Sequence, residues 1–103
     1  MSDHLRIERQ SAALHRVIAA RIRSGDEQPL ARARANLSRW KQQFGGELPP
    51  AYVEWEQLLE RGVGAVLQTL EGDDQQSARR RSSSPFAGVL SPRERWDILR
   101  HAA

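Results

Sequence analysis

The sequence contains no cysteine, a single lysine among its 16 basic residues, and no long hydrophobic run. Without cysteine, neither a disulfide framework nor a thiolate metal site can form, which fits a reducing cytosol. No apolar run approaches the roughly 18 residues that a membrane span requires, and the N-terminus lacks the charged start and apolar stretch of a signal peptide. We therefore expect a cytoplasmic protein that does not interact with membranes.

The basic residues are almost all arginine, because Lys41 is the only lysine, and the net charge is +3 at pH 7. Arginine binds phosphates and base edges bidentately, so this composition is compatible with nucleic-acid binding. A source genome rich in G and C would produce the same excess, because its codons favour arginine. The composition leaves both explanations open.

The spacing of apolar residues predicts an all-α fold, a small bundle of five or six helices in a single domain of 103 residues. The chain divides into an antiparallel helical hairpin, a pair of shorter helices, a polar linker, and an apolar cap loop with a C-terminal helix. These parts are residues 1–46, 47–72, 73–84 and 85–103, respectively. One or two helical turns capped by Asp73 or Asp74 are expected within the linker. Ser2 is the expected N-cap of the first helix, and Gly25 is expected to end it near Ser24.

An apolar loop leads directly into the C-terminal helix. Solvated loops are polar, so this loop predicts a cap that is buried over a groove between other helices. Its apolar residues are Pro85, Phe86, Val89 and Leu90. Ser91 is the expected N-cap of the helix, with Pro92 at the first helical position, and Glu94 three residues after the serine completes a capping box.

The predicted core unites apolar residues from every part of the chain. In the second helix, the apolar residues between Leu30 and Phe44 alternate steps of three and four, as in a coiled-coil seam. We expect this seam to pack against the first helix, and a homodimer seam is the alternative. The C-terminal helix should contribute an arc that includes Ala102 and Ala103. The expected core residues are Leu14, Ile18, Leu37, Trp40, Phe44, Trp55, Leu58, Leu67, Phe86, Leu90 and Trp96.

Two sets of arginines are candidate contacts for a partner protein or for nucleic acid. Arg9, Arg16 and Arg23 recur every seven residues opposite the apolar side of the first helix, without counter-charges on that helix. Such a stripe could contact a phosphate backbone or could simply be solvated. Arg32 and Arg39 form one flank of the second helix.

Arg95 falls inside the apolar arc of the C-terminal helix. An unpaired buried charge is costly, so its guanidinium is expected to reach a carboxylate, a carbonyl or water. A structural ion pair with an acid of the third helix is one interpretation. Binding of an anionic ligand is the other.

Catalytic constellations are not recognisable in the sequence. His4 and His15 are eleven residues apart, about 16 Å along a helix, so they cannot share a metal ion with bonds near 2 Å. No serine or threonine stands at a nucleophile elbow or beside a histidine and an acid in recognisable order. We expect a protein that is not an enzyme and that uses no metal and no cofactor.

Two segments resemble a group of small uncharacterised bacterial helical proteins, some of which are antitoxin-like. They are Leu48–Trp55 (LPPAYVEW) and Ser83–Trp96 (SSPFAGVLSPRERW), and the resemblance extends over roughly residues 30–100. It implies a bacterial cytosolic protein and brings no catalytic residue with it. No toxin-contacting segment can be matched residue by residue.

The sequence therefore favours a non-enzymatic interaction or regulatory module that binds a partner protein or a second copy of itself. Its charge is modest and is divided among several faces, which is atypical of a dedicated nucleic-acid reader. The alternative function is weak, sequence-independent binding of nucleic acid through the arginine stripe of the first helix.

Overall fold

The computed structural model describes residues 3–101, and within this range the chain forms six helices and no strand. The expected cap at Ser2 and the alanines at 102 and 103 lie outside the described residues. None of the helices in residues 3–101 combines the length and the apolar character needed to cross a membrane. The all-α prediction and the expected number of helices are confirmed. The helices are α1 (Asp3–Arg23), α2 (Gln28–Gln43), α3 (Pro50–Arg61), α4 (Val63–Glu71), α5 (Gln75–Arg81) and α6 (Pro92–His101).

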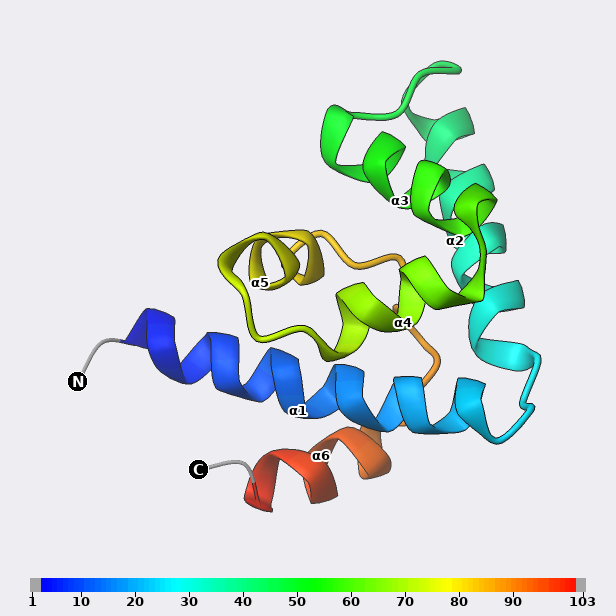
Figure 1. Ribbon diagram of the computed structural model, residues 1–103. Helices are drawn as coiled ribbons and strands as arrows, with labels where there is room; N and C mark the ends of the chain where they lie inside the picture. Colours follow the sequence, from blue (N-terminus) through cyan, green and yellow to red (C-terminus); the bar gives the residue numbers. More distant parts are fainter. Residues whose placement is uncertain (1–2, 102–103) are drawn as a thin grey trace.

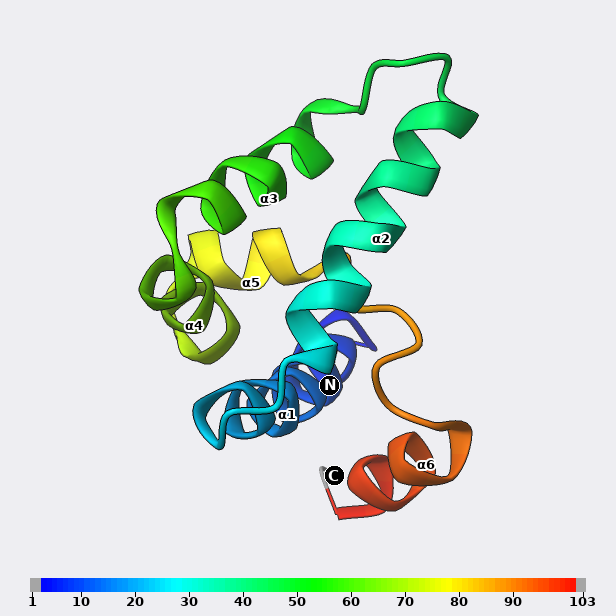
Figure 2. The same ribbon diagram turned by 90° about the vertical axis from the view of Figure 1, so that its right-hand side faces the viewer.

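The long helix α1 organises the arrangement, with α4 and α5 on one side of it and α6 on the other (Figure 1). After the turn at Gly25, whose φ is 93°, α2 leaves α1 at a steep angle and lies opposite α3 (Figure 2). The expected antiparallel hairpin therefore needs correction, because α1 and α2 meet only near their connecting turn. The apolar face of α1 packs chiefly against α4 and α6. Val66 and Leu70 of α4 are almost completely buried in the same core as the apolar residues of α1.

The core agrees with the expected list except at two aromatic residues. Seven of its members are buried, and Trp40 and Leu67 are partly buried against them. Phe44 and Trp96 are 56% and 62% exposed, so the prediction that they belong to the core is wrong. Phe44 directly follows the last turn of α2, at the end of that helix far from α1. Trp96 is exposed because α6 packs against the core with its other side, which carries Ile98 and Leu99. The seven buried members are Leu14, Ile18, Leu37, Trp55, Leu58, Phe86 and Leu90.

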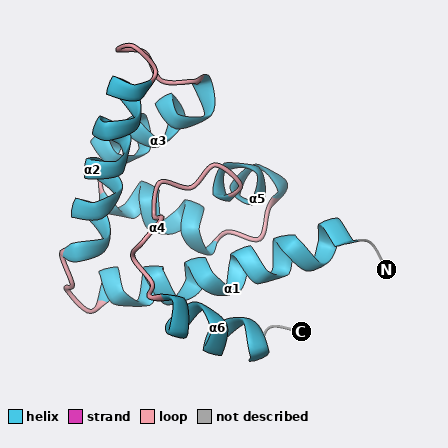
Figure 3. Ribbon diagram, turned by 180° about the vertical axis from the view of Figure 1, so that it is seen from behind, coloured by secondary structure: helices cyan, strands magenta, loops and turns pink. Residues whose placement is uncertain are grey.

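The apolar cap loop is buried as predicted. The segment between α5 and α6 crosses the fold (Figure 3) and places Phe86 and Leu90 in the core. Asn36 of α2 is 1% exposed, and its Nδ2 donates hydrogen bonds to the carbonyls of Pro85 and Ala87, both at 2.9 Å. These two bonds tie the loop to α2 and satisfy two carbonyl groups at the loop's turn.

The start of α6 is confirmed in detail. The Ser91 hydroxyl accepts a hydrogen bond from the Glu94 backbone N–H at 3.1 Å, and the Glu94 carboxylate accepts one from the Ser91 N–H at 3.0 Å. This reciprocal pair is the capping box that the spacing predicts. The same Glu94 carboxylate accepts a hydrogen bond from Arg21, which fixes the start of α6 to α1.

The one or two helical turns expected within the polar linker form the short helix α5, and the expected cap at Asp74 is confirmed. The Asp74 carboxylate accepts a hydrogen bond from the Ser77 N–H at 3.1 Å and caps α5. A hydrogen bond from the Ser77 hydroxyl, together with this backbone bond, holds the pKa of Asp74 below its usual value. On the inner side of α5, Ser77 and Arg81 are four residues apart and both are buried.

Candidate functional site

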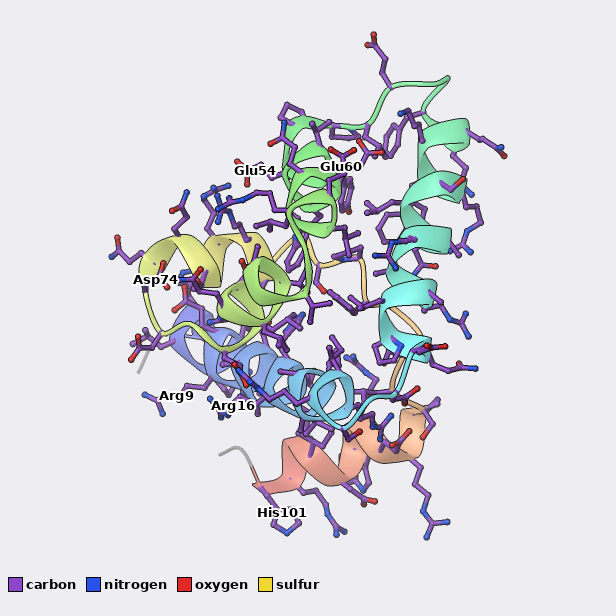
Figure 4. All side chains as sticks on the ribbon, turned by 45° about the vertical axis from the view of Figure 1, so that its right-hand side comes forward. Arg9, Arg16, Glu54, Glu60, Asp74 and His101 are labelled. Carbon is purple, nitrogen blue, oxygen red and sulfur yellow. The ribbon has the colours of Figure 1, made fainter. Side chains whose placement is uncertain are left out.

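The arginine stripe of α1 is divided by tertiary neighbours. Figure 4 shows Arg9 and Arg16 projecting from the same side of α1. Arg23, further along, donates from Nε and Nη2 to both carboxylate oxygens of Glu71 at 3.0 and 2.6 Å. These hydrogen bonds raise the pKa of Arg23 and lower that of Glu71. Arg23 therefore has a counter-charge, which α4 supplies and its own helix does not.

Arg9 and Arg16 form no ion pair with the other described residues. They line a hollow of about 210 Å³ between α1 and the turn that joins α4 to α5. Three acidic residues line the same hollow, namely Glu8, Glu71 and Asp73. A polyanion approaching Arg9 and Arg16 would therefore meet both signs of charge.

Arg32 and Arg39 share one side of α2, as their seven-residue spacing predicts, and line a broad hollow of about 710 Å³. Arg39 donates from Nη2 to the Asn36 side-chain oxygen at 2.9 Å. Asp26 and Glu27 line the other end of the hollow, so it also carries mixed charge. The arginines of α2 and of the α1 stripe line separate hollows and do not make one basic face.

Arg95 is exposed, and its guanidinium forms no hydrogen bond or ion pair with another described residue. The expected ion pair with an acid of α3 is not formed. Glu54 of α3 pairs instead with Arg79 at 3.1 Å, and Glu56 pairs with Lys41 at 3.7 Å. The alternative expectation, an anionic ligand, remains open, because Arg95 lines a pocket that contains two other basic residues.

Those two residues are His15 and Arg81, and the sequence predicts neither of them as a site residue. For His15 it predicts only that no metal ion is shared with His4, and it predicts that Arg81 lies in the polar linker. They are 7% and 6% exposed. Arg81 Nη1 donates to the carbonyls of Thr69 and Gly72 at 2.9 and 2.6 Å, and so caps the end of α4. The signal available for Arg81 was its position four residues after Ser77 in a helix capped by Asp74.

His15 is held neutral by its surroundings. Its Nδ1 lies 2.7 Å from the Ser11 carbonyl oxygen, which can only accept, so Nδ1 carries the proton and Nε2 has a free lone pair. Burial, the largest cause, together with the charges of Arg81 and Arg95, lowers the pKa of His15 to about 4. The hydrogen bond to Ser11 opposes this shift.

Stability should fall as the pH decreases from about 6.5 to about 4, because unfolded His15 takes up a proton near pH 6.5 and folded His15 resists until about pH 4. In that window the unfolded state binds more protons, and the full difference corresponds to about 3 kcal/mol. Urea midpoints of the wild type and His15→Gln at pH 7 and 4.5 measure the effect. A wild type whose midpoint falls no more steeply than that of His15→Gln would contradict it.

The outer face of α6 exposes a large aromatic side chain. Trp96 is 62% exposed, and Arg93 and Arg100 stand three residues before and four residues after it, on the same side of the helix. Arg100 lies 3.9 Å from Asp97, and Arg93 has no ion-pair partner among the described residues. An aromatic residue flanked by arginines has the composition of an interface hot spot.

Among residues 3–101, no group of three or more histidine and acidic side chains could hold a metal ion. The candidate sites are thus the outer face of α6 and the pocket that contains His15, Arg81 and Arg95. The first can contact a macromolecular surface, and the second can hold a small ligand. Comparisons with protein-family models, with curated proteins and with solved structures give no match to this chain.

Proposed function

We propose that this protein works without catalysis, by binding a partner protein through the outer face of α6. The observation that supports the proposal is the exposure of Trp96, since Trp55, of the same residue type, is fully buried in the core. Burial of a large aromatic side chain is among the strongest single contributions to association, and its indole N–H can in addition donate to the partner. A partner that covers Trp96 would therefore gain affinity from one side chain.

The charges around Trp96 favour an acidic partner surface. Arg93 and Arg100 flank the indole, and α6 as a whole has three arginines against Glu94 and Asp97. Complementary charge at the rim of an interface mainly speeds association and rejects partners of the same sign. We expect a partner with an apolar pocket surrounded by carboxylates. The resemblance of residues 48–55 and 83–96 favours a bacterial, cytoplasmic and antitoxin-like form of this regulatory role.

Affinity capture from the source cells with the tagged protein tests the proposal. The wild type should retain a distinct partner, and Trp96→Ala should lose it without a change in its thermal midpoint, because Trp96 contributes little to the core. Phe44→Ala is the matched control, because Phe44 is an exposed aromatic residue at the far end of α2. A partner retained equally by all three proteins, or by none of them, would contradict the proposal.

A second copy of the chain is the other occupant to be tested. The predicted α2 seam is an unsuitable dimer interface, because Ala33 and Leu37 are 0% and 3% exposed within one chain. We expect light scattering to give the monomer mass, 11.7 kDa. A dimer that Trp96→Ala dissociates would reassign the α6 face to self-association.

Weak, sequence-independent nucleic-acid binding is the alternative function, supported by the absence of ion pairs from Arg9 and Arg16 to other described residues. Because Arg23 donates to Glu71, only two arginines of this stripe are available to neutralise phosphates, instead of three. The slope of log affinity against log salt on duplex DNA should therefore be no steeper than about −1.8. Fluorescence anisotropy over a salt series measures it. Tight, sequence-selective binding at physiological salt would favour this alternative over a protein partner.

A further inference from the structure

A pocket of about 250 Å³ lies between α1, the segment that follows α5, and α6. The residues in its lining that can be charged are all basic: His15 from α1, Arg81 from the end of α5, and Arg95 from α6. Among the described residues, no aspartate or glutamate lines it. The volume is slightly below the range of about 300–1,000 Å³ that holds drug-sized ligands, so the pocket suits a small ion.

No acidic side chain of the described residues lines this pocket to balance its positive charge. Arg81 uses only Nη1, for two carbonyl groups, and its Nε and Nη2 have no partner among residues 3–101. The guanidinium of Arg95 likewise has none. Asp74 and Glu8, the acids whose fields act on Arg81, lie outside the pocket lining. A mostly buried arginine beside a second cation is stabilised by an anion that approaches both.

Two further groups in the lining supply one donor and one acceptor. The Ser84 hydroxyl oxygen accepts from the Phe86 N–H at 3.2 Å, which leaves its own O–H free to donate. His15 commits Nδ1–H to the Ser11 carbonyl, and Nε2 has no partner among the described residues. A lone pair at Nε2 repels a bare anionic oxygen and attracts a hydroxyl proton.

We propose that this pocket binds a small oxyanion that retains a hydroxyl proton, of which hydrogen phosphate is the example. Arg81, Arg95 and Ser84 donate to its oxygens, and His15 Nε2 accepts its O–H. Arginine is suited to this role because its guanidinium donates in a planar fork to two oxygens. The site is separate from the outer face of α6, so it does not depend on the proposed function. Trp96→Ala should leave it intact.

Titration of the full chain with sodium phosphate at pH 8 tests the proposal, with sodium chloride holding the ionic strength constant and the His15 ring signals followed by NMR. We expect saturable binding, and Arg95→Gln should raise Kd by about tenfold or more, because it removes a charged donor. Arg93→Gln is the matched control, since Arg93 is also exposed on α6 but lies outside the pocket lining. It should leave Kd unchanged.

Sulfate and glycerol phosphate test whether the ligand needs a hydroxyl proton for His15 Nε2. Neither has a hydroxyl proton on its anionic group at pH 8, so both should bind less tightly than hydrogen phosphate. Sulfate should bind more tightly as the pH falls, by up to tenfold per pH unit, because it can enter once His15 takes up a proton. Arg81 and Arg95 are the charged groups whose fields act on His15. His15→Gln should abolish this pH dependence, provided that its thermal midpoint shows it to be folded.

Three results would overturn the proposal. The first is a response to phosphate no larger than the response to chloride. The second is an equal loss of affinity in Arg93→Gln and Arg95→Gln, which would indicate a diffuse charge effect instead of a site. The third is binding of sulfate or glycerol phosphate at pH 8 as tight as that of hydrogen phosphate, which would remove the role of His15 Nε2.

Discussion

Replacing Trp55 by alanine is expected to lower the free energy of unfolding by about 3–5 kcal/mol. Trp55 is fully buried, its ring meets the Phe86 ring edge-on at a centroid distance of 5.7 Å, and its indole N–H donates to the Arg80 carbonyl at 2.9 Å. The substitution opens a large cavity beneath the cap loop and leaves that carbonyl without its donor. Urea denaturation followed by circular dichroism measures the loss.

Trp96→Ala is the matched control, because it removes the same side chain from a site that is 62% exposed. Its unfolding free energy should stay within about 0.5 kcal/mol of the wild type. Similar losses in the two variants would contradict the assignment of Trp55 to the core and of Trp96 to the surface. The same result would also remove the reason for placing a partner protein on the outer face of α6.

Leu37→Asp is expected to unfold the monomer. Leu37 is 3% exposed within the core, and an ionised carboxylate there would lose its hydration without gaining a partner. Typical domains are stable by only about 5–15 kcal/mol, and a chain of this size has one modest core. Circular dichroism at pH 7 should show loss of the helical signal.

Ser38→Asp is the control for this substitution, since the adjacent Ser38 is exposed and the new charge stays in water. It should remain folded with a midpoint close to that of the wild type. If Leu37→Asp instead remained folded and converted a dimer into a monomer, the α2 seam would pair between chains. That result would contradict the packing of α2 within the chain.

Local signals in the sequence were sufficient for the helices and their ends. The capping box of Ser91 and Glu94 depends on residues three apart, and the turn at Gly25 needs a residue that accepts a positive φ. Burial of the cap loop could also be predicted, because several consecutive apolar residues in a loop are costly in water. These features need no knowledge of distant parts of the chain.

Tertiary neighbours decide the features that the sequence could not predict. Trp55 and Trp96 both fit apolar arcs, and only the position of α6 on α1 turns Trp96 outward. Arg23 looked unpaired because its partner, Glu71, is 48 residues away in the sequence. Arg81 follows two other arginines in a polar segment, and its burial depends on α5 packing against α4 and α1. The pocket that it lines could not be recognised before that packing was known.

Site-specific photocrosslinking in the source cells is the most direct test of whether the outer face of α6 binds a partner protein. A photoreactive residue replaces Arg93 in one variant, Arg100 in a second, and Gln43 in a third, where Gln43 is an exposed position at the end of α2. We expect a covalent adduct with one distinct partner protein from positions 93 and 100 and none from position 43. Adducts only from position 43, or no adduct from any of the three, would contradict binding of a partner through the outer face of α6.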